Sequence, residues 1–192
     1  MTAIGSLAVY CGSAAGRDPR HGETAQLLGG VLAERGIALV YGGGKLGLMG
    51  IVADSVLAAG GRAYGVIPDA LHSAEVAHGG LTELYRVADM HERKAKMTQL
   101  ADGFLCLPGG IGTLDELMEA WTWNALGYHA KPFCLLNENG YWDGFLRFCD
   151  TVAAEGFMSA GRRAQLLSAA TIDDALERLE AAAARAVNKP VR

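Results

Sequence analysis

The amino-acid sequence predicts one α/β domain, a Rossmann-like doubly wound parallel sheet with helices on both faces. Three observations support this fold class. Short apolar runs alternate with segments of helical periodicity along the chain. The apolar runs are continuously hydrophobic instead of alternating with polar residues, which is typical of strands buried on both faces of a parallel sheet. Glycine clusters follow such runs, at the carboxyl ends of strands, where sheets of this kind bind ligands.

The first half of the chain contains three predicted strands and two predicted helices. Residues 6–10 form the first strand, which runs into the turn Cys11-Gly12-Ser13. Residues 20–35 have leucine and valine at core-facing helical spacing, and Gly36 ends this helix because glycine readily adopts the left-handed conformation. The other elements of this half are a strand at 38–41, a helix at 48–59 and a strand at 63–67.

The second half continues the alternation after a polar loop at residues 71–82 that contains histidines. The elements expected here are a short strand at 83–87, a helix at 90–100, a strand at 104–107, a helix at 112–126, a strand at 133–136, a helix at 142–155 and an alanine-rich closing helix at 172–186. No internal repeat, linker or low-complexity tract divides them. Residues 1–192 are therefore expected to form a single domain.

The composition argues against several classes of protein. Of the 192 residues, 51% are hydrophobic and 20% are charged, which permits a sizeable core and argues against disorder. The formal net charge of −4, without a basic stripe, argues against a nucleic-acid partner. No segment approaches the ~20 consecutive apolar residues of a membrane span, so no membrane association is expected. Four cysteines without a C-x-x-C pair indicate a reduced, cytoplasmic protein.

The strongest functional segment is Pro108-Gly109-Gly110-Ile111-Gly112-Thr113-Leu114-Asp115-Glu116, which follows a predicted strand and opens a helix. Its glycines let the backbone approach a ligand closely, and the free N–H groups and dipole of a helix start favour a phosphate group. It is not a Walker A loop, because G-x-x-x-x-G-K-[ST] is absent from the chain. Thr113 and Glu116 also match a T-x-x-E capping box, so Glu116 is either a capping residue or an active-site carboxylate.

A second segment, Met90-His91-Glu92-Arg93-Lys94-Ala95, opens the predicted helix at 90–100, with Asp89 as its N-cap. Arg93 and Lys94 then lie near the first turn, where the helix dipole disfavours each cation by ~0.3–1 kcal/mol. An anion bound between this helix start and the glycine segment would remove the mismatch. The alternative is a charged, solvated helix face without a ligand.

A third segment, from Tyr41 to Gly50, invites a dinucleotide-binding interpretation. Gly42, Gly44 and Gly47 formally match G-x-G-x-x-G, and Asp69 follows about 20 residues later. However, the match follows the second strand instead of the first, and the chain leaves no room for a substrate domain. We therefore expect the backbone here to contact a base or sugar. The histidines show no metal-ligand spacing and G-x-S-x-G is absent, so neither a metal site nor a serine hydrolase is expected.

These segments, in this order, resemble the LOG ("lonely guy") family of nucleoside-5′-monophosphate phosphoribohydrolases. Three motifs carry the resemblance: Gly-Gly-Gly-x-x-Gly-Leu-Met-Gly, Met-His-x-Arg-Lys-Ala and Pro-Gly-Gly-x-Gly-Thr-x-x-Glu. Residues 122–132 are also similar to the family's Thr-Trp-x-x-Leu-Gly-x-His-x-Lys-Pro tract. The resemblance spans residues 8–168.

The resemblance implies hydrolysis of the N-glycosidic bond of a nucleoside 5′-monophosphate, commonly one with an N6-prenylated adenine that is released as a cytokinin. It implies homodimers with sites near the subunit interface, and neither a metal nor an organic cofactor. It places Arg93 and Glu116 at catalytic positions. The substrate-binding positions implied in this way are Glu75, Lys94, Gly110, Ile111, Gly112, Thr113 and Thr122, and the glycine segments themselves add Gly109, Gly42, Gly43 and Gly44.

The chemistry of this reaction suits these residue types. Breaking a ribosyl–adenine bond generates oxocarbenium-like charge at the anomeric carbon. Glu116 can stabilise this cation or take a proton from the attacking water. Arg93 is suited to phosphate or ribose oxygens and to holding the carboxylate in place. Two alternatives are a nucleotide carrier without turnover, and decarboxylation of lysine with pyridoxal phosphate held by a lysine side chain.

Overall fold

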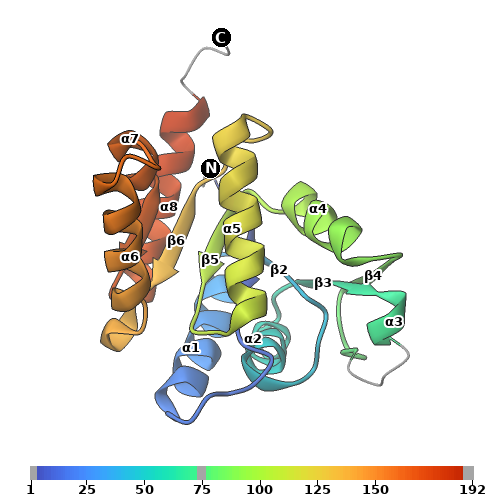
Figure 1. Ribbon diagram of the computed structural model, residues 1–192. Coiled ribbons are helices and arrows are strands. Elements are labelled where there is room, and N and C mark those ends of the chain that lie inside the picture. Colours follow the sequence, from blue (N-terminus) through green and yellow to red (C-terminus); the bar gives the residue numbers. More distant parts are fainter. Residues whose placement is uncertain (1–3, 73–76, 188–192) are drawn as a thin grey trace.

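The structure is a computed structural model that describes residues 4–72 and 77–187. Its centre is one seven-stranded sheet with the strand order β4-β3-β2-β1-β5-β6-β7, in which every neighbouring pair is parallel (Figure 1). This confirms the predicted doubly wound parallel sheet. The strands are β1 (Ser6–Tyr10), β2 (Ala38–Tyr41), β3 (Ala63–Pro68), β4 (Glu83–Val87), β5 (Gly103–Cys106), β6 (Phe133–Leu136) and β7 (Leu166–Ala169).

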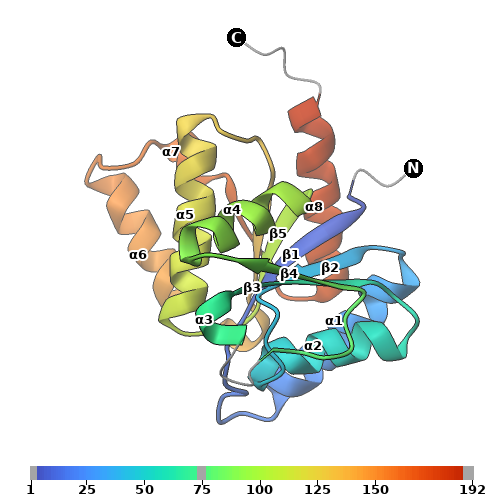
Figure 2. The same ribbon diagram turned by 90° about the vertical axis from the view of Figure 1, so that its right-hand side faces the viewer.

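Helices cover both faces of the sheet, and Figure 2 shows the two helical layers on opposite sides of the strands. One layer contains α1, α2 and α8, and the other contains α4, α5 and α6. The helices are α1 (Arg20–Glu34), α2 (Gly47–Ala58), α3 (Asp69–His72), α4 (Met90–Leu100), α5 (Ile111–Leu126), α6 (Asp143–Ala154), α7 (Ala160–Arg163) and α8 (Ile172–Val187), with a 3-10 helix η1 (Glu138–Gly140) before α6. Within the described residues, no helix combines the length and apolar character needed to cross a membrane.

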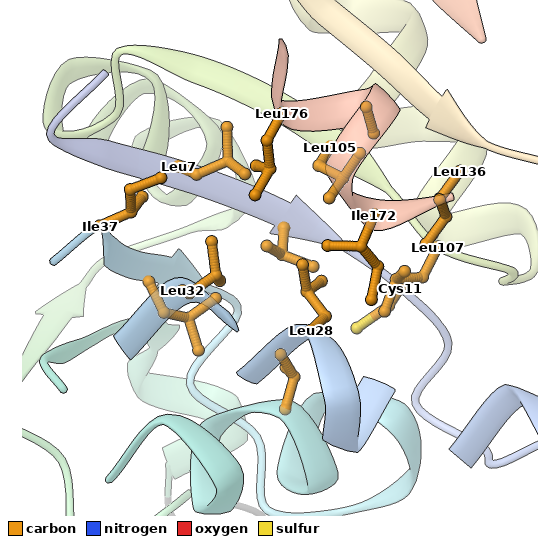
Figure 3. Packing of buried hydrophobic residues seen from close by; sticks show 14 of the residues in the cluster. Leu7, Cys11, Leu28, Leu32, Ile37, Leu105, Leu107, Leu136, Ile172 and Leu176 are labelled. Atoms are coloured by element: carbon orange, nitrogen blue, oxygen red, sulfur yellow. The ribbon is translucent and has the colours of Figure 1, made fainter. Parts of the chain in front are cut away.

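Each layer has its own apolar core, because the strands present side chains alternately to the two faces. Figure 3 shows the first core, in which side chains from α1 and α8 meet those of the sheet: Leu28, Leu32, Ile172, Leu176, Leu7, Leu105 and Leu107. The second core is more aromatic, with Tyr10, Phe104 and Phe133 from the strands beneath Trp121 of α5. The continuous apolar runs of the sequence thus supply two cores at once.

The sequence prediction missed the edge strand β7 and the short elements α3, α7 and η1. β7 is four residues long, includes a serine and is half-exposed at its centre, so its local pattern resembles a loop. It is a strand because it pairs with β6 along its whole length, from Leu166 opposite Phe133 to Ala169 opposite Leu136. The predicted helix at 142–155 begins and ends one residue inside those bounds, and the other element ends differ by no more than one residue.

The strand order reverses at β1, which lies between β2 and β5. From β1 the chain moves outward to β4 and then returns to start β5 on the other side of β1. Tyr10 pairs with Cys106, so the carboxyl ends of β1 and β5 lie at the same level of the sheet. The loops that follow these two strands diverge, and at such a point an open α/β sheet forms its ligand crevice.

Candidate active site

A cleft of about 410 Å³ lies at this reversal of strand order. It is formed by the loops after β1, β2 and β5, the end of β3, and residues of α2, α3, α4 and α5. The described residues that line it are Cys11, Gly12, Ser13, Gly42, Gly44, Leu46, Met49, Ile67, Leu71, Arg93, Gly110, Ile111, Gly112, Thr113 and Glu116. Residues of all three predicted segments therefore meet in one place.

The start of α5 is open to the cleft. The N-cap residue is Gly110, which has an extended backbone, and no side chain of the described residues caps the helix. The N–H groups of a first helical turn have no partners within the helix. Ideal Cβ atoms built on Gly110 or Gly112 would meet nothing within 4 Å, so both glycines leave room for a ligand beside these N–H groups.

Of the two roles left open for Glu116, the capping box with Thr113 is wrong. Because the helix begins at Ile111, Thr113 is already the third helical residue and Glu116 lies in the second turn. Thr113 is buried instead against Gly109, where a Cβ atom would lie 2.0 Å from the Thr113 hydroxyl oxygen. Glu116 is therefore free of a capping role, and its side chain is turned into the cleft.

Arg93 and Glu116 form an ion pair at the bottom of the cleft. Arg93 Nη2 lies 3.1 Å from Glu116 Oε1, and the two side chains are only 11% and 9% exposed. Burial raises the pKa of Glu116 to about 7, although the neighbouring Arg93 guanidinium opposes this rise. Arg93 Nε is buried and has no hydrogen-bond partner among the described residues. The pair thus places a carboxylate that titrates near neutrality beside a guanidinium group in the same cleft.

Arg93 lies on α4, a helix whose first N–H groups are hydrogen-bonded by a side-chain cap. The Asp89 side chain accepts hydrogen bonds from the backbone N–H groups of His91 and Glu92, as expected for the predicted N-cap. The Glu92 carboxylate accepts a hydrogen bond from the Ala88 N–H group, 2.8 Å away. The start of α4 therefore already holds carboxylates, and among the described lining residues only Arg93 comes from this helix.

The loop after β2 makes room for Arg93. A Cβ atom at Gly42 would lie 1.9 Å from Arg93 Nη2, so a glycine is required for the guanidinium to reach the cleft. Gly42 and Gly44 line the cleft, whereas Gly43 packs behind it against Ile67 and Leu84, with a positive φ of 74°.

The dinucleotide interpretation receives no support from the position of Asp69. Its carboxylate forms an ion pair with Arg86 at 2.7 Å, and it is not among the described residues that line the cleft. The ribose-binding carboxylate of a dinucleotide site would have to reach the ligand.

Several predicted binding residues lie outside the cleft. Lys94 Nζ is 3.0 Å from Asp115 Oδ2 and also contacts Glu119, both on α5. Thr122 is exposed on α5, two turns beyond the catalytic carboxylate predicted at residue 116. Glu75 lies outside the described residues. In the described part of the chain, no three His, Cys, Asp or Glu side chains gather to hold a metal ion.

The sequence prediction did not select four apolar residues that line the cleft, namely Leu46, Met49, Ile67 and Leu71. A weak signal was present, because Leu46 belongs to the loop after β2, Met49 lies in the first turn of the helix that follows it, and Ile67 ends a predicted strand. An apolar residue at a strand end is most often part of the core, so sequence alone does not distinguish the two roles.

Comparisons with known proteins show the family to which the chain belongs. A family model described as a possible lysine decarboxylase matches residues 49–179. The chain is 48% identical over 174 residues to the cytokinin riboside 5′-monophosphate phosphoribohydrolase LOG of Oryza sativa subsp. japonica, covering 91% of this chain and 72% of the rice protein. It is 43% identical over 172 residues to the cytokinin riboside 5′-monophosphate phosphoribohydrolase of Rhodococcoides fascians, covering 89% of this chain and 87% of that protein.

A solved structure of a different protein shares the fold. The Moco carrier protein from Chlamydomonas reinhardtii matches with a TM-score of 0.69 at 20% sequence identity, over 94% of this chain and 98% of that chain. At this level of identity, the likeness shows a common architecture and nothing about the ligand.

Proposed function

The chain belongs to the LOG family of cytokinin riboside 5′-monophosphate phosphoribohydrolases, and we propose that its cleft hydrolyses N6-prenylated adenosine 5′-monophosphate. The products are the free base, a cytokinin, and ribose 5-phosphate. The observation that carries this proposal is the buried Arg93–Glu116 pair beside the uncapped start of α5. A carboxylate for the sugar and an anion site for the phosphate thus share one cleft.

The phosphate is bound at the start of α5. The backbone N–H groups of Ile111, Gly112 and Thr113 lie at the positive end of the helix dipole, which favours a dianionic group. The phosphate is not part of the scissile bond, so the free energy of binding it can be used to orient the sugar and to lower the barrier at the reacting carbon.

Glu116 acts on the anomeric carbon. The bond between ribose and base breaks with build-up of positive charge on the sugar, and a buried carboxylate either stabilises this charge or accepts a proton from the attacking water. Both roles require the ionised form of Glu116, whose pKa is about 7. The enzyme therefore works with a carboxylate that is basic enough to accept a proton at neutral pH.

Arg93 holds this carboxylate and contacts the substrate. Its Nη2 atom is engaged with Glu116, and the Arg93 side chain also lines the cleft. A guanidinium group presents several donors in a fixed plane, so it can bind the carboxylate and a ribose or phosphate oxygen together.

The base is placed against apolar side chains of the cleft. Leu46, Met49, Ile67 and Leu71 are among the described residues that line it. A planar adenine with an N6-prenyl group gains free energy by leaving water for such a wall. Gly42 and Gly44 also line the cleft, and in this proposal their backbone contacts the base or sugar.

The described lysines do not fit decarboxylation with pyridoxal phosphate. None of Lys45, Lys94, Lys96 and Lys131 lines the cleft. Lys94 is paired with carboxylates, and Lys131 Nζ donates to the carbonyl oxygen of Thr98 at 2.6 Å. Among the described residues, no lysine lies at the site to form the Schiff base on which that chemistry depends.

A homodimer with sites near the interface is part of the proposal. Ile111, Met118 and Leu126 of α5 are 87%, 43% and 66% exposed. Their spacing places them with Thr122 along one stripe of the helix, and Ile111 also borders the cleft. A second copy packed on this stripe would bury apolar surface and close one side of the cleft, which gives Thr122 access to a ligand across the interface.

A cytoplasmic location is also proposed. The four cysteines Cys11, Cys106, Cys134 and Cys149 are free and buried. Free thiols are usual in the reducing environment of the cytoplasm, where structural disulfides are rare.

Turnover of 5′-monophosphates tests the function directly. We expect the wild-type protein to release free base from AMP and from isopentenyl-AMP, measured by chromatography. Glu116→Gln should lower kcat by at least ~100-fold, the usual contribution of a positioned acid or base, without loss of the fold. Arg93→Lys should lower kcat/KM by about 10-fold or more, because lysine cannot contact two groups in one plane.

The control variant is Glu155→Gln, which changes an exposed carboxylate at the end of α6. It should retain wild-type turnover. If the protein binds a panel of 5′-monophosphates but releases base from none of them, it is a nucleotide carrier and not an enzyme. Near-normal turnover by Glu116→Gln would remove this residue from catalysis.

A further inference from the structure

Tyr141 contacts the phosphate-binding turn from outside the cleft. Its hydroxyl group donates a hydrogen bond to the carbonyl oxygen of Gly109, 2.7 Å away. Tyr141 follows η1, is half-exposed and is not among the described residues that line the cleft. We infer that Tyr141 is a positioning residue that fixes the Gly109–Gly110 peptide so that the N–H group of Gly110 faces the phosphate. This inference rests on the proposed function.

The geometry of the peptide unit connects Tyr141 to the cleft. A trans peptide is planar, and its C=O and N–H groups point in opposite directions. When Tyr141 holds the Gly109 carbonyl oxygen on the outer side, the N–H group of Gly110 points to the other side. Gly110 borders both the cleft and the outer cavity that contains Tyr141, and Tyr141 borders only the outer cavity, so the side away from Tyr141 is the cleft. The same bond keeps a carbonyl oxygen, which would repel phosphate, away from the ligand.

The turn needs such a restraint because sterics hold only one of its two glycines: Gly109 packs against Thr113 and Gly12, whereas Gly110 is not packed in this way. The peptide joins two glycines, which have the widest choice of backbone angles. A Cβ atom at Gly110 would meet nothing within 4 Å, so this residue is not wedged in place. A second cavity of about 360 Å³, lined by Tyr141, Gly109 and Gly110, lies next to the turn and leaves space for a flipped peptide. The preceding peptide is held separately, since Gly12 N–H donates to the Pro108 carbonyl oxygen at 3.1 Å.

Tyr141 is itself held by contacts between η1 and α1. Arg20 Nη1 donates to the side-chain oxygen of Asn139 at 3.0 Å, and the Thr24 hydroxyl group donates to the Glu138 carboxylate. The His21 ring packs edge-on against the Tyr141 ring, with centroids 5.7 Å apart. The hydroxyl group therefore has a defined position, and η1 transmits the position of α1 to the start of α5.

The variant Tyr141→Phe tests the inference, because it removes the hydroxyl group and keeps the ring and its contact with His21. We expect KM for isopentenyl-AMP to rise about 3- to 10-fold, the effect of one neutral hydrogen bond, while kcat changes less than twofold. The inhibition constant of ribose 5-phosphate should rise by the same factor. The inhibition constant of free adenine, which carries no phosphate, should stay unchanged.

Tyr85→Phe is the matched control. The Tyr85 hydroxyl group also donates a 2.7 Å hydrogen bond, to Glu83 Oε2, but on β4 and away from the cleft. All four constants should stay at wild-type values in this variant. Unchanged KM in Tyr141→Phe, or equal weakening of ribose 5-phosphate and adenine, would overturn the inference.

Failure of the proposed function gives a different result. In that case the wild-type protein itself would release no base. Calorimetric titration with inorganic phosphate would then decide the role of Tyr141 without turnover. Weaker phosphate binding to Tyr141→Phe than to the wild type supports the positioning role, and equal binding refutes it.

Discussion

At the scale of single residues, Glu116 shows how burial changes a side chain's chemistry. The sequence left two roles open for it, a helix cap and an active carboxylate. The structure removes the cap, because α5 begins at Ile111. Desolvation raises the pKa of Glu116 to about 7, and Arg93 at 3.1 Å keeps the ionised form within reach of neutral pH. No local sequence pattern contains that information.

This pKa predicts the pH dependence of the reaction. The ionised carboxylate is the working form, so a raised pKa means that activity is lost as the pH falls below about 7. We expect log kcat/KM for isopentenyl-AMP to rise from pH 5 to pH 7 and then level off. An unshifted carboxylate would instead keep its activity down to about pH 4.5, near its ordinary pKa.

The substrate phosphate also titrates near pH 6, so a control is needed. The residual activity of Glu116→Gln supplies it, because ionisation of the substrate is the same for both proteins. The rise in log kcat/KM with a midpoint near pH 7 should be absent from this variant. A rise that persists unchanged in Glu116→Gln would assign the titration to another group.

At the scale of elements, two helix starts differ in a way that assigns their roles. α4 is capped by the Asp89 carboxylate, whereas α5 has the glycine N-cap Gly110 and no side-chain cap among the described residues. The uncapped N–H groups that can bind an anion are therefore those of α5, whereas α4 contributes the side chain of Arg93. Both segments were recognisable in the sequence, but their division of labour depends on which N–H groups are already bonded.

The glycine loop after β2 predicts the effect of Gly42→Ala. The added methyl group would overlap Arg93 Nη2, which is the far end of a flexible side chain, so the fold should survive while the guanidinium moves. Displacement by about 1 Å of a group that orients the reaction can cost up to ~100-fold in rate, and we expect kcat to fall 10- to 100-fold. Steady-state kinetics and thermal unfolding measure the two effects.

Gly30→Ala is the matched control, since Gly30 lies within α1 and an added Cβ atom would meet nothing within 4 Å. This variant should keep wild-type kcat and raise the free energy of unfolding by roughly 0.5–1 kcal/mol, because alanine favours a helix. Equal kcat values in Gly42→Ala and Gly30→Ala would mean that the position of Arg93 is unimportant.

At the scale of the whole molecule, the exposed stripe of α5 predicts self-association. Met118→Lys places a charge at the centre of the stripe, and a buried unpaired charge is strongly unfavourable. We expect the wild-type protein to have the mass of a dimer in light scattering, and Met118→Lys to shift towards the monomer. Activity should fall with the dimer, because the stripe borders the cleft at Ile111.

Leu27→Lys is the control on the opposite layer of helices. Leu27 is 62% exposed on α1, so it is as accessible as the α5 residues but lies on the other face of the sheet. This variant should keep the wild-type mass. A monomeric wild type, or dissociation by Leu27→Lys alone, would contradict the proposed interface.

Much of the fold could be predicted from the sequence because it depends on local patterns. Continuous apolar runs of four to six residues mark strands that are covered on both faces, and the periodic segments between them mark the covering helices. The glycine segments could be placed at strand ends for the same reason. β7 could not be predicted, since its strand conformation depends on pairing with β6 rather than on its own residues.

The sequence by itself determined the parallel sheet, the glycine segments at its carboxyl edge and the resemblance to a family of hydrolases. Only the tertiary structure decided that Arg93 and Glu116 form a buried pair, that Lys94 and Thr122 face away from the cleft, and that Tyr141 holds Gly109. The physical reason is that periodicity and backbone preference are properties of neighbouring residues. Burial, pKa and hydrogen bonding at the site depend on segments that meet only after the sheet has folded.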